Sequence, residues 1–190
     1  MKRITIFCGS SEGTEEDFKE TAYSLGQYLA LQNIEVVYGG AKIGLMGAVA
    51  DGALSKRGKI TGVIPEFLTG KEIVHTSLTE LIVTKTMHER KTIMDELSDG
   101  IIALPGGFGT LEELFEILTW GQLGLHQKPI AILNVNGFYD ELIAFMDTMV
   151  KKGFLKKANQ EMLLESNTIS ELIDKMKAYQ APEVEKWIKK

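Results

Sequence analysis

A glycine-rich stretch and a basic stretch carry the residues of this chain that are best suited to chemistry. The first, LPGGFGTLEEL (104–114), contains three glycines and then two adjacent glutamates, Glu112 and Glu113. The second, TMHERK (86–91), carries Arg90, which shares a helical face with apolar residues three, four and seven positions further on. An arginine on an apolar face needs an anionic partner, and a phosphate or a carboxylate would serve. The alternative is an arginine whose charged end reaches solvent.

Two glycine-rich turns each lie between an expected strand and an expected helix: YGGAKIGLMG (38–47) and LPGGFGT (104–110). Glycine lets backbone N–H groups approach a ligand, and a helix N-terminus adds positive potential, so both turns suit a phosphate. A tight turn needs glycine in any case, but two such turns in one chain favour a nucleotide-type ligand. Neither turn matches G-x-G-x-x-G or G-x-x-x-x-G-K-[ST], which disfavours a simple NAD-dependent enzyme and a P-loop NTPase.

Both stretches also contain the spacing of a helix capping box. Thr86 with Glu89, and Thr110 with Glu113, each place a glutamate three residues after a threonine. We expect Glu89 to be a capping residue. For Glu113 the spacing alone leaves open whether the carboxylate caps a helix or does chemistry.

Short apolar runs alternate with helical patterns along the whole chain. We expect strands over 3–8, 34–40, 59–64, 80–85, 100–105, 129–135 and 162–166, and helices over 14–32, 44–58, 86–99, 111–124, 139–151 and 169–179. This alternation predicts an α/β fold: a doubly wound, Rossmann-like parallel sheet with helices on both faces, in one domain spanning 1–190. Ligands of such sheets lie beyond the carboxyl ends of the strands, so the loops at those ends are the expected site.

Composition narrows the class of protein and of partner. The 190 residues carry a net charge of −5 without a basic block, so we expect no nucleic-acid partner. Cys8 is the single cysteine, which excludes an internal disulfide, suits a cytoplasmic location and is most simply a small buried residue. The first apolar run is too short for a signal peptide, and no stretch suits a membrane span. The three histidines, at 75, 88 and 126, lack metal-ligand spacing, so we expect no metal.

Taken together, the motifs resemble the lonely-guy family of cytokinin-activating phosphoribohydrolases. The matching segments are FCGSSEG, YGGAKIGLMGAVA, MHERK, PGGFGTLEE and TWGQLGLHQKP, and the resemblance runs from about residue 3 to residue 180. It implies a Rossmann-like homodimer that cleaves the N-glycosidic bond of adenosine-type 5′-monophosphates, N6-prenylated AMP and AMP, to free base and ribose 5-phosphate. Members were long labelled lysine decarboxylases. No lysine here stands in a motif for a pyridoxal phosphate Schiff base, so we expect no cofactor.

The resemblance also implies the residues of the site. Arg90 and Glu113 correspond to the family's essential pair, in which a carboxylate meets the positive charge that develops on the ribose. Glu113 would then have both roles, catalytic and capping. The family's nucleotide contacts, together with the neighbouring loops, give the expected substrate-binding residues Ser10, Gly39, Gly40, Glu72, Lys91, Gly106, Gly107, Phe108, Gly109, Thr110, Leu111, Glu112 and Thr119. The main alternative is a nucleotide-binding or carrier protein without turnover, which would have no need of a carboxylate facing the ribose.

Overall fold

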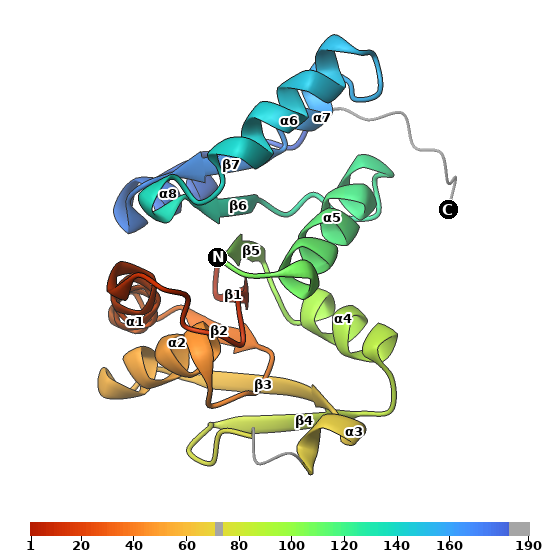
Figure 1. The fold of residues 1–190 in the computed structure, drawn as a ribbon. Coiled ribbons are helices and arrows are strands. Elements are labelled where there is room, and N and C mark those ends of the chain that lie inside the picture. Colours follow the sequence, from red (N-terminus) through yellow and green to blue (C-terminus); the bar gives the residue numbers. More distant parts are fainter. Residues whose placement is uncertain (71–73, 183–190) are drawn as a thin grey trace.

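A seven-stranded parallel sheet runs through the centre of the computed structural model (Figure 1). The structure describes residues 1–70 and 74–182. The order across the sheet is β4-β3-β2-β1-β5-β6-β7. The strands are β1 (Arg3–Phe7), β2 (Glu35–Tyr38), β3 (Ile60–Pro65), β4 (Glu80–Thr84), β5 (Gly100–Ala103), β6 (Ile130–Leu133) and β7 (Leu163–Ser166). Each lies within two residues of its expected apolar run. The inner strands are apolar along their length because they are buried on both faces, whereas the edge strands β4 and β7 are partly exposed.

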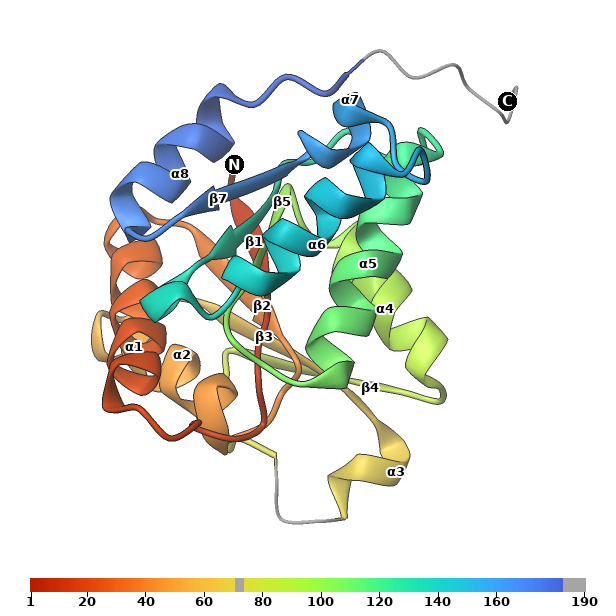
Figure 2. The same ribbon diagram turned by 45° about the horizontal axis from the view of Figure 1, so that its top comes forward.

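Helices cover both faces of the sheet, as Figures 1 and 2 show. One face packs against α1 (Glu16–Leu31), α2 (Gly44–Ser55) and α8 (Ile169–Ala178), and the other against α4 (Met87–Glu96), α5 (Phe108–Gln122) and α6 (Asp140–Lys151). The shorter helical turns are α3 (Glu66–Thr69), η1 (Val135–Gly137) and α7 (Lys157–Gln160). Each face has its own cluster of buried apolar side chains, so the predicted α/β fold class is confirmed.

The strand order places a topological switch point between β1 and β5. From β1 the chain builds β2, β3 and β4 outward on one side, then returns to place β5 against the other side of β1. The connections after β1 and β5 therefore leave the sheet in opposite directions, which opens a crevice beyond their carboxyl ends. Among residues 1–70 and 74–182, no helix is long and apolar enough to cross a membrane.

The start of α4 follows the predicted capping pattern. The hydroxyl of Thr86 accepts a hydrogen bond from the backbone N–H of Glu89 at 3.1 Å. The Glu89 carboxylate reaches back to the N–H of Lys85 at 2.7 Å, one residue earlier than in the usual capping box. The predicted structural role of Glu89 is confirmed.

The start of α5 differs from the prediction, and the capping role expected for Glu113 is wrong. The helix begins at Phe108 with Gly107 as its N-cap, so Thr110 lies inside the first turn. Gly107 has extended backbone angles, and no side-chain cap is present at this helix start. A similar shift occurs at α1. This helix begins at Glu16, and the side chain of its N-cap residue, Glu15, makes no capping hydrogen bond, so the helix start expected at Thr14 is also wrong. In both places the spacing of residue types along the sequence does not determine where the helix begins.

Candidate active site

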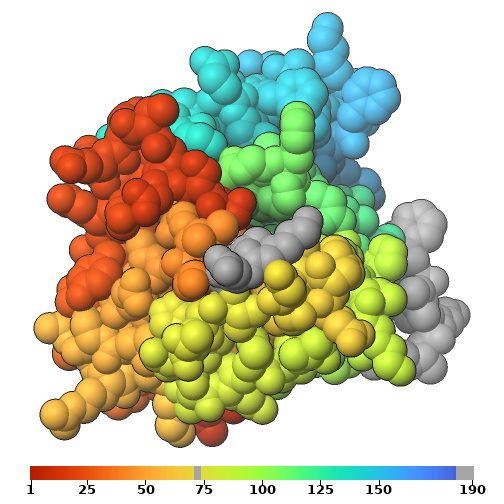
Figure 3. All heavy atoms as spheres, turned by 60° about the horizontal axis from the view of Figure 1, so that its bottom comes forward, coloured from red at the N-terminus to blue at the C-terminus, as the bar shows by residue number. Residues whose placement is uncertain are grey.

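A cavity of about 480 Å³ lies at the switch point, beyond the carboxyl ends of β1, β2, β3 and β5. Its volume falls within the range of small-molecule sites. Figure 3 shows one face of the molecule on which the segments after β1 (red), β2 (orange) and β5 (green) meet. Eight of the expected site residues line the cavity: Ser10, Gly39, Arg90, Gly107, Phe108, Gly109, Thr110 and Glu113.

Arg90 and Glu113 form a buried ion pair in the wall of this cavity. Arg90 projects from the first turn of α4 and Glu113 from the second turn of α5. Their Nη1 and Oε1 atoms are 2.7 Å apart, and the two side chains are 11% and 8% exposed. The Nε of Arg90 also donates to the carbonyl oxygen of Val63, at 3.0 Å, so β3 fixes the direction of the guanidinium. The partner that an arginine on an apolar face requires is therefore a carboxylate of the same chain.

Two opposing effects set the protonation of Glu113. Burial raises the pKa of this carboxyl above its ordinary value, and the positive charge of Arg90 opposes the rise. A carboxyl group that faces a cavity and has a raised pKa is suited to proton transfer. The pair can thus supply a negative charge, a general base or a general acid beside a bound ligand.

The start of α5, from Gly107 to Thr110, lines the cavity with backbone polar groups, and Gly106 lies next to it. The first helical hydrogen bond of α5 runs from the N–H of Leu111 to the carbonyl of Gly107, so the N–H groups before Leu111 are unpaired within the helix. A Cβ on Gly106 would lie 2.1 Å from Oγ1 of Thr110, whereas a Cβ on Gly107 or Gly109 would meet nothing within 4 Å. Only Gly106 is required by packing. The other two glycines leave the N–H groups of the helix start open to an anion.

The cavity is also lined by apolar residues that were not among the expected site residues: Ala41, Ile43, Met46, Ile64 and Leu68. They come from the connection after β2, from the start of α2, from β3 and from α3. Ala41, Ile43 and Met46 lie within the glycine-rich stretch at 38–47, whose apolar residues were not expected to take part, whereas no motif marks Ile64 and Leu68. Cys8 also lines the cavity and is buried, and burial raises the pKa of its thiol, which keeps this sulfur protonated.

Several expected binding residues are not brought to the cavity. Lys91 and Glu112 bond to each other across α4 and α5, with Nζ and Oε1 2.6 Å apart. Thr119 lies on the exposed surface of α5, where its hydroxyl donates to the carbonyl of Phe115 at 2.7 Å. Leu111 is half-buried, outside the cavity wall.

Two expected glycines have structural roles next to the cavity, and one expected residue lies outside the description. Gly106 packs beneath Thr110, and Gly40 adopts a φ of +77° that favours glycine. Glu72 falls outside the described residues. Within the described part of the chain, no three His, Cys, Asp or Glu side chains cluster as a metal site would require.

The fold and the cavity together define a Rossmann-like α/β protein with a small-molecule site at its switch point. The model of the family described as possible lysine decarboxylase matches residues 46–176. The chain is 42% identical over 179 residues to the cytokinin riboside 5'-monophosphate phosphoribohydrolase LOG3 of Arabidopsis thaliana, covering 94% of this chain and 83% of that protein. It is 44% identical to LOG5 of the same plant, covering 94% and 78%. The chain therefore belongs to this family, that of the LOG phosphoribohydrolases.

Solved structures agree with the fold. The molybdenum cofactor binding protein of Rippkaea orientalis superposes with a TM-score of 0.72 at 26% identity, covering 94% of this chain and 97% of that one. The protein TM1055 superposes with a TM-score of 0.73 at 19% identity, covering 94% and 100%. The second likeness shows the fold alone.

Proposed function

We propose that this protein hydrolyses the N-glycosidic bond of adenosine-type nucleoside 5′-monophosphates and releases the free base and ribose 5-phosphate. Family membership supports this reaction. The observation that carries the proposal is the buried pair of Arg90 and Glu113, which faces a cavity beside the N-terminus of α5. The substrates we propose are N6-prenylated AMP and AMP.

Glu113 has the central role in the proposed reaction. Cleavage of the bond between C1′ and the base builds positive charge on the ribose, and a carboxylate beside that carbon stabilises it. Water then bonds to C1′, one of its protons passes to the departing base, and the other remains on the new hydroxyl. The raised pKa of Glu113 suits it to relay that proton. Arg90 orients the carboxylate and favours its charged form.

The polar and apolar parts of the cavity lining suggest how the rest of the substrate would bind. The 5′-phosphate would bind the open N–H groups between Gly107 and Thr110, and Ser10 and Gly39 also line the cavity. The base and its N6 substituent would lie against the apolar side chains. Direct nucleotide contacts by Glu72, Lys91, Glu112 and Thr119 stay predictions from the resemblance.

A comparison of AMP, N6-isopentenyl-AMP and the two matching nucleosides tests the function. We expect free base and ribose 5-phosphate from the monophosphates, followed by chromatography, and little reaction of the nucleosides, because phosphate supplies the anchoring contacts. Comparable kcat/KM for adenosine and AMP would contradict phosphate anchoring. Tight binding of AMP with no release of base would favour the alternative of a carrier without turnover, a role that also fits the cofactor-binding neighbour of similar fold.

The proposed assembly is a homodimer in the cytoplasm. The resemblance implies a dimer, and exposed apolar side chains support it, among them Phe108, Leu125 and Phe145, which are 94%, 54% and 57% exposed. One chain has a mass of 21.1 kDa. Light scattering at micromolar concentration should report twice that mass, and a particle of a single chain's mass would contradict the dimer.

A further inference from the structure

Lys91 follows Arg90 directly in α4, but its side chain does not line the cavity. Its Nζ lies 2.6 Å from Oε1 of Glu112 and 2.9 Å from Oε2 of Glu116, both on α5, and the side chain is only 8% exposed. We propose that Lys91 is a positioning residue for the reaction: bound to these two glutamates, it fixes α4 against α5 and keeps Glu113 charged and directed at Arg90. This inference rests on the proposed function, in which Glu113 acts on the ribose.

The geometry of the neighbouring ion pairs between α4 and α5 supports the first part of the inference, that Lys91 fixes one helix against the other. Arg90 and Lys91 are consecutive on one helix, and Glu112 and Glu113 are consecutive on the other. Consecutive helical residues point about 100° apart, so the two ion pairs join the same turns in different directions. Both helices are already held on the sheet by buried side chains, among them Met94 of α4 and Leu114 of α5. The second ion pair adds a restraint in a different direction, which holds the facing turns of α4 and α5 against each other and with them the direction of the Glu113 carboxylate.

The charges around Glu113 support the second part of the inference, that Lys91 keeps this carboxylate charged. Among the described residues, the charged and titratable groups around it are Arg90 and Lys91 from α4, Glu112 from its own helix, and the Cys8 thiol beyond β1. Burial and the charge of Glu112 raise the pKa of Glu113, whereas Arg90 and Lys91 lower it. Because Lys91 binds Glu112 directly, it offsets a neighbouring carboxylate that opposes the charged form of Glu113.

A buried lysine bonded to two carboxylates is poorly placed to bind a nucleotide itself. Its ammonium has three donors, and Glu112 and Glu116 take two of them. Reaching the cavity would break both ion pairs and leave Glu112 uncompensated beside Glu113. The structure therefore separates the positions of two adjacent basic residues: Arg90 lines the cavity, and Lys91 binds the neighbouring helix.

The test compares Lys91→Met and Glu112→Gln with a matched control, Lys128→Met. Lys128 is also a partly buried lysine, 21% exposed, and is bonded to a carboxylate of α4, but its partner Asp95 lies at the opposite end of that helix. The titration of Glu113 is followed directly by ¹³C NMR of protein labelled at the glutamate carboxyl carbon. The Glu113 signal is identified by its loss in Glu113→Gln. The pH dependence of kcat/KM for AMP is measured in parallel.

We expect opposite shifts from the two test variants. Lys91→Met removes a positive charge, so the Glu113 titration and the acidic limb of kcat/KM should move to higher pH, by about 1 pH unit. Glu112→Gln removes a negative charge and should move both to lower pH. Lys128→Met should move neither, even where it lowers the melting temperature. Lys91→Arg should restore the wild-type profile, because an arginine keeps the charge and can reach the same glutamates.

Three results would overturn the inference. The first is an unchanged Glu113 titration in Lys91→Met together with a raised KM for AMP, which would make Lys91 a substrate contact. The second is an equal shift in Lys128→Met, which would show general loosening of α4. The third result, which decides if Lys91→Met does not fold, is a Glu113 titration that does not move to lower pH in Glu112→Gln. A wild-type protein that releases no base from AMP would refute the proposed function, while the NMR titration would still decide the role of Lys91.

Discussion

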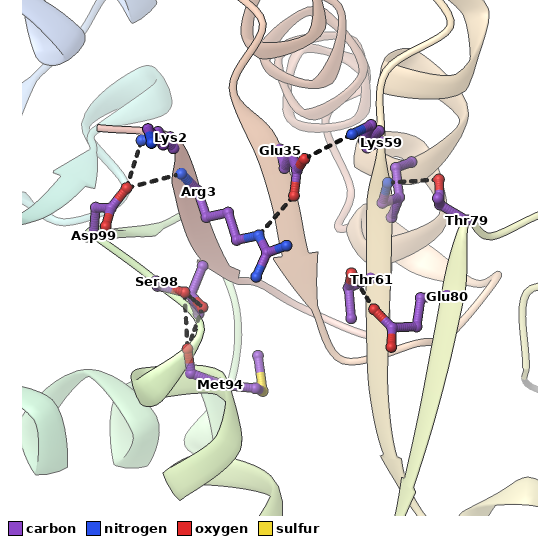
Figure 4. A network of polar contacts seen from close by, with 12 residues as sticks. Lys2, Arg3, Glu35, Lys59, Thr61, Thr79, Glu80, Met94, Ser98 and Asp99 are labelled. Atoms are coloured by element: carbon purple, nitrogen blue, oxygen red, sulfur yellow. Dashed lines mark hydrogen bonds and ion pairs between the residues drawn. The ribbon is translucent and has the colours of Figure 1, made fainter.

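Two groups of charged side chains lie at opposite ends of the same parallel strands. At the amino end, Arg3, Glu35 and Lys59 link the starts of β1, β2 and β3, as Figure 4 shows. Arg3 Nε lies 2.6 Å from Glu35 Oε2, and the side chains are 41% and 26% exposed. At the carboxyl end, Arg90 and Glu113 are 2.7 Å apart, but only 11% and 8% exposed. The distances between nitrogen and oxygen in the two ion pairs are alike, but the exposure of the two pairs to water differs.

The two glutamates show what this difference does. The hydrogen bond from Arg3 holds the pKa of Glu35 below its ordinary value, since water still reaches the pair. Burial raises the pKa of Glu113 even though an arginine touches it. The charges of an exposed ion pair are hydrated and screened by water, so the pair contributes little to the free energy of unfolding. A buried pair in a cavity wall is costly to keep charged, and such groups concentrate at functional sites.

The largest effect is expected at the buried carboxylate. Glu113→Gln should lower kcat for AMP by about 10²–10⁴, because a neutral amide cannot stabilise the developing positive charge. The start of α5 should be unaffected, since Gly107 and not Glu113 forms its cap. Kinetics with AMP and a thermal melt measure both effects. Near-normal kcat would show that Glu113 has no catalytic role and that the two ends of the sheet differ only in exposure.

A smaller effect, on stability, is expected from Arg90→Ala. Removing one partner of a buried pair costs about 3–5 kcal/mol. Without Arg90, burial acts unopposed, and the folded-state pKa of Glu113 rises further above its unfolded value of about 4.3. A raised carboxyl pKa gives stability that is present below the unfolded pKa and lost as pH rises through the folded pKa. The deficit against wild type should therefore be small near pH 5 and larger near pH 8, measured by urea unfolding.

A double variant serves as the control for that pH dependence. Arg90→Ala combined with Glu113→Gln has no carboxyl at this position, so its stability deficit against wild type should not grow between about pH 5 and about pH 8. A double variant as pH-dependent as Arg90→Ala would assign the effect to other groups.

The smallest effect is expected at the exposed end of the sheet. Glu35→Gln should cost at most about 1 kcal/mol near neutral pH, and less in high salt, because water screens the pair. The lowered pKa of Glu35 gives stability that is present above its unfolded pKa and lost as pH falls through the folded pKa, the reverse of the trend in Arg90→Ala. Urea unfolding near pH 7 and near pH 4 measures it. A large, salt-independent loss would remove the distinction between the two ends.

Local patterns predicted most of the elements. Apolar runs placed the seven strands of the sheet, and the Thr86 and Glu89 spacing placed the start of α4, because each signal acts through neighbours in sequence. The same spacing failed at Thr110 and Glu113. There Gly107 begins the helix earlier, and Glu113 bonds to a residue 23 positions away. A long-range charge partner competes with a local cap, and spacing cannot show which prevails.

The sequence by itself determined the fold class, and its motifs singled out the anion-suited turn and the pair of Arg90 and Glu113, whose catalytic role stays a prediction. Only the tertiary structure decided which charged residues share the cavity. Arg90 and Lys91 are adjacent in sequence, yet one lines the cavity and the other lies between two helices. The apolar part of the cavity lining, with Ile43, Met46 and Leu68, likewise comes from segments that meet only in the folded protein. The physical reason is that side-chain direction and burial depend on how helices pack across the sheet, and no local pattern records that packing.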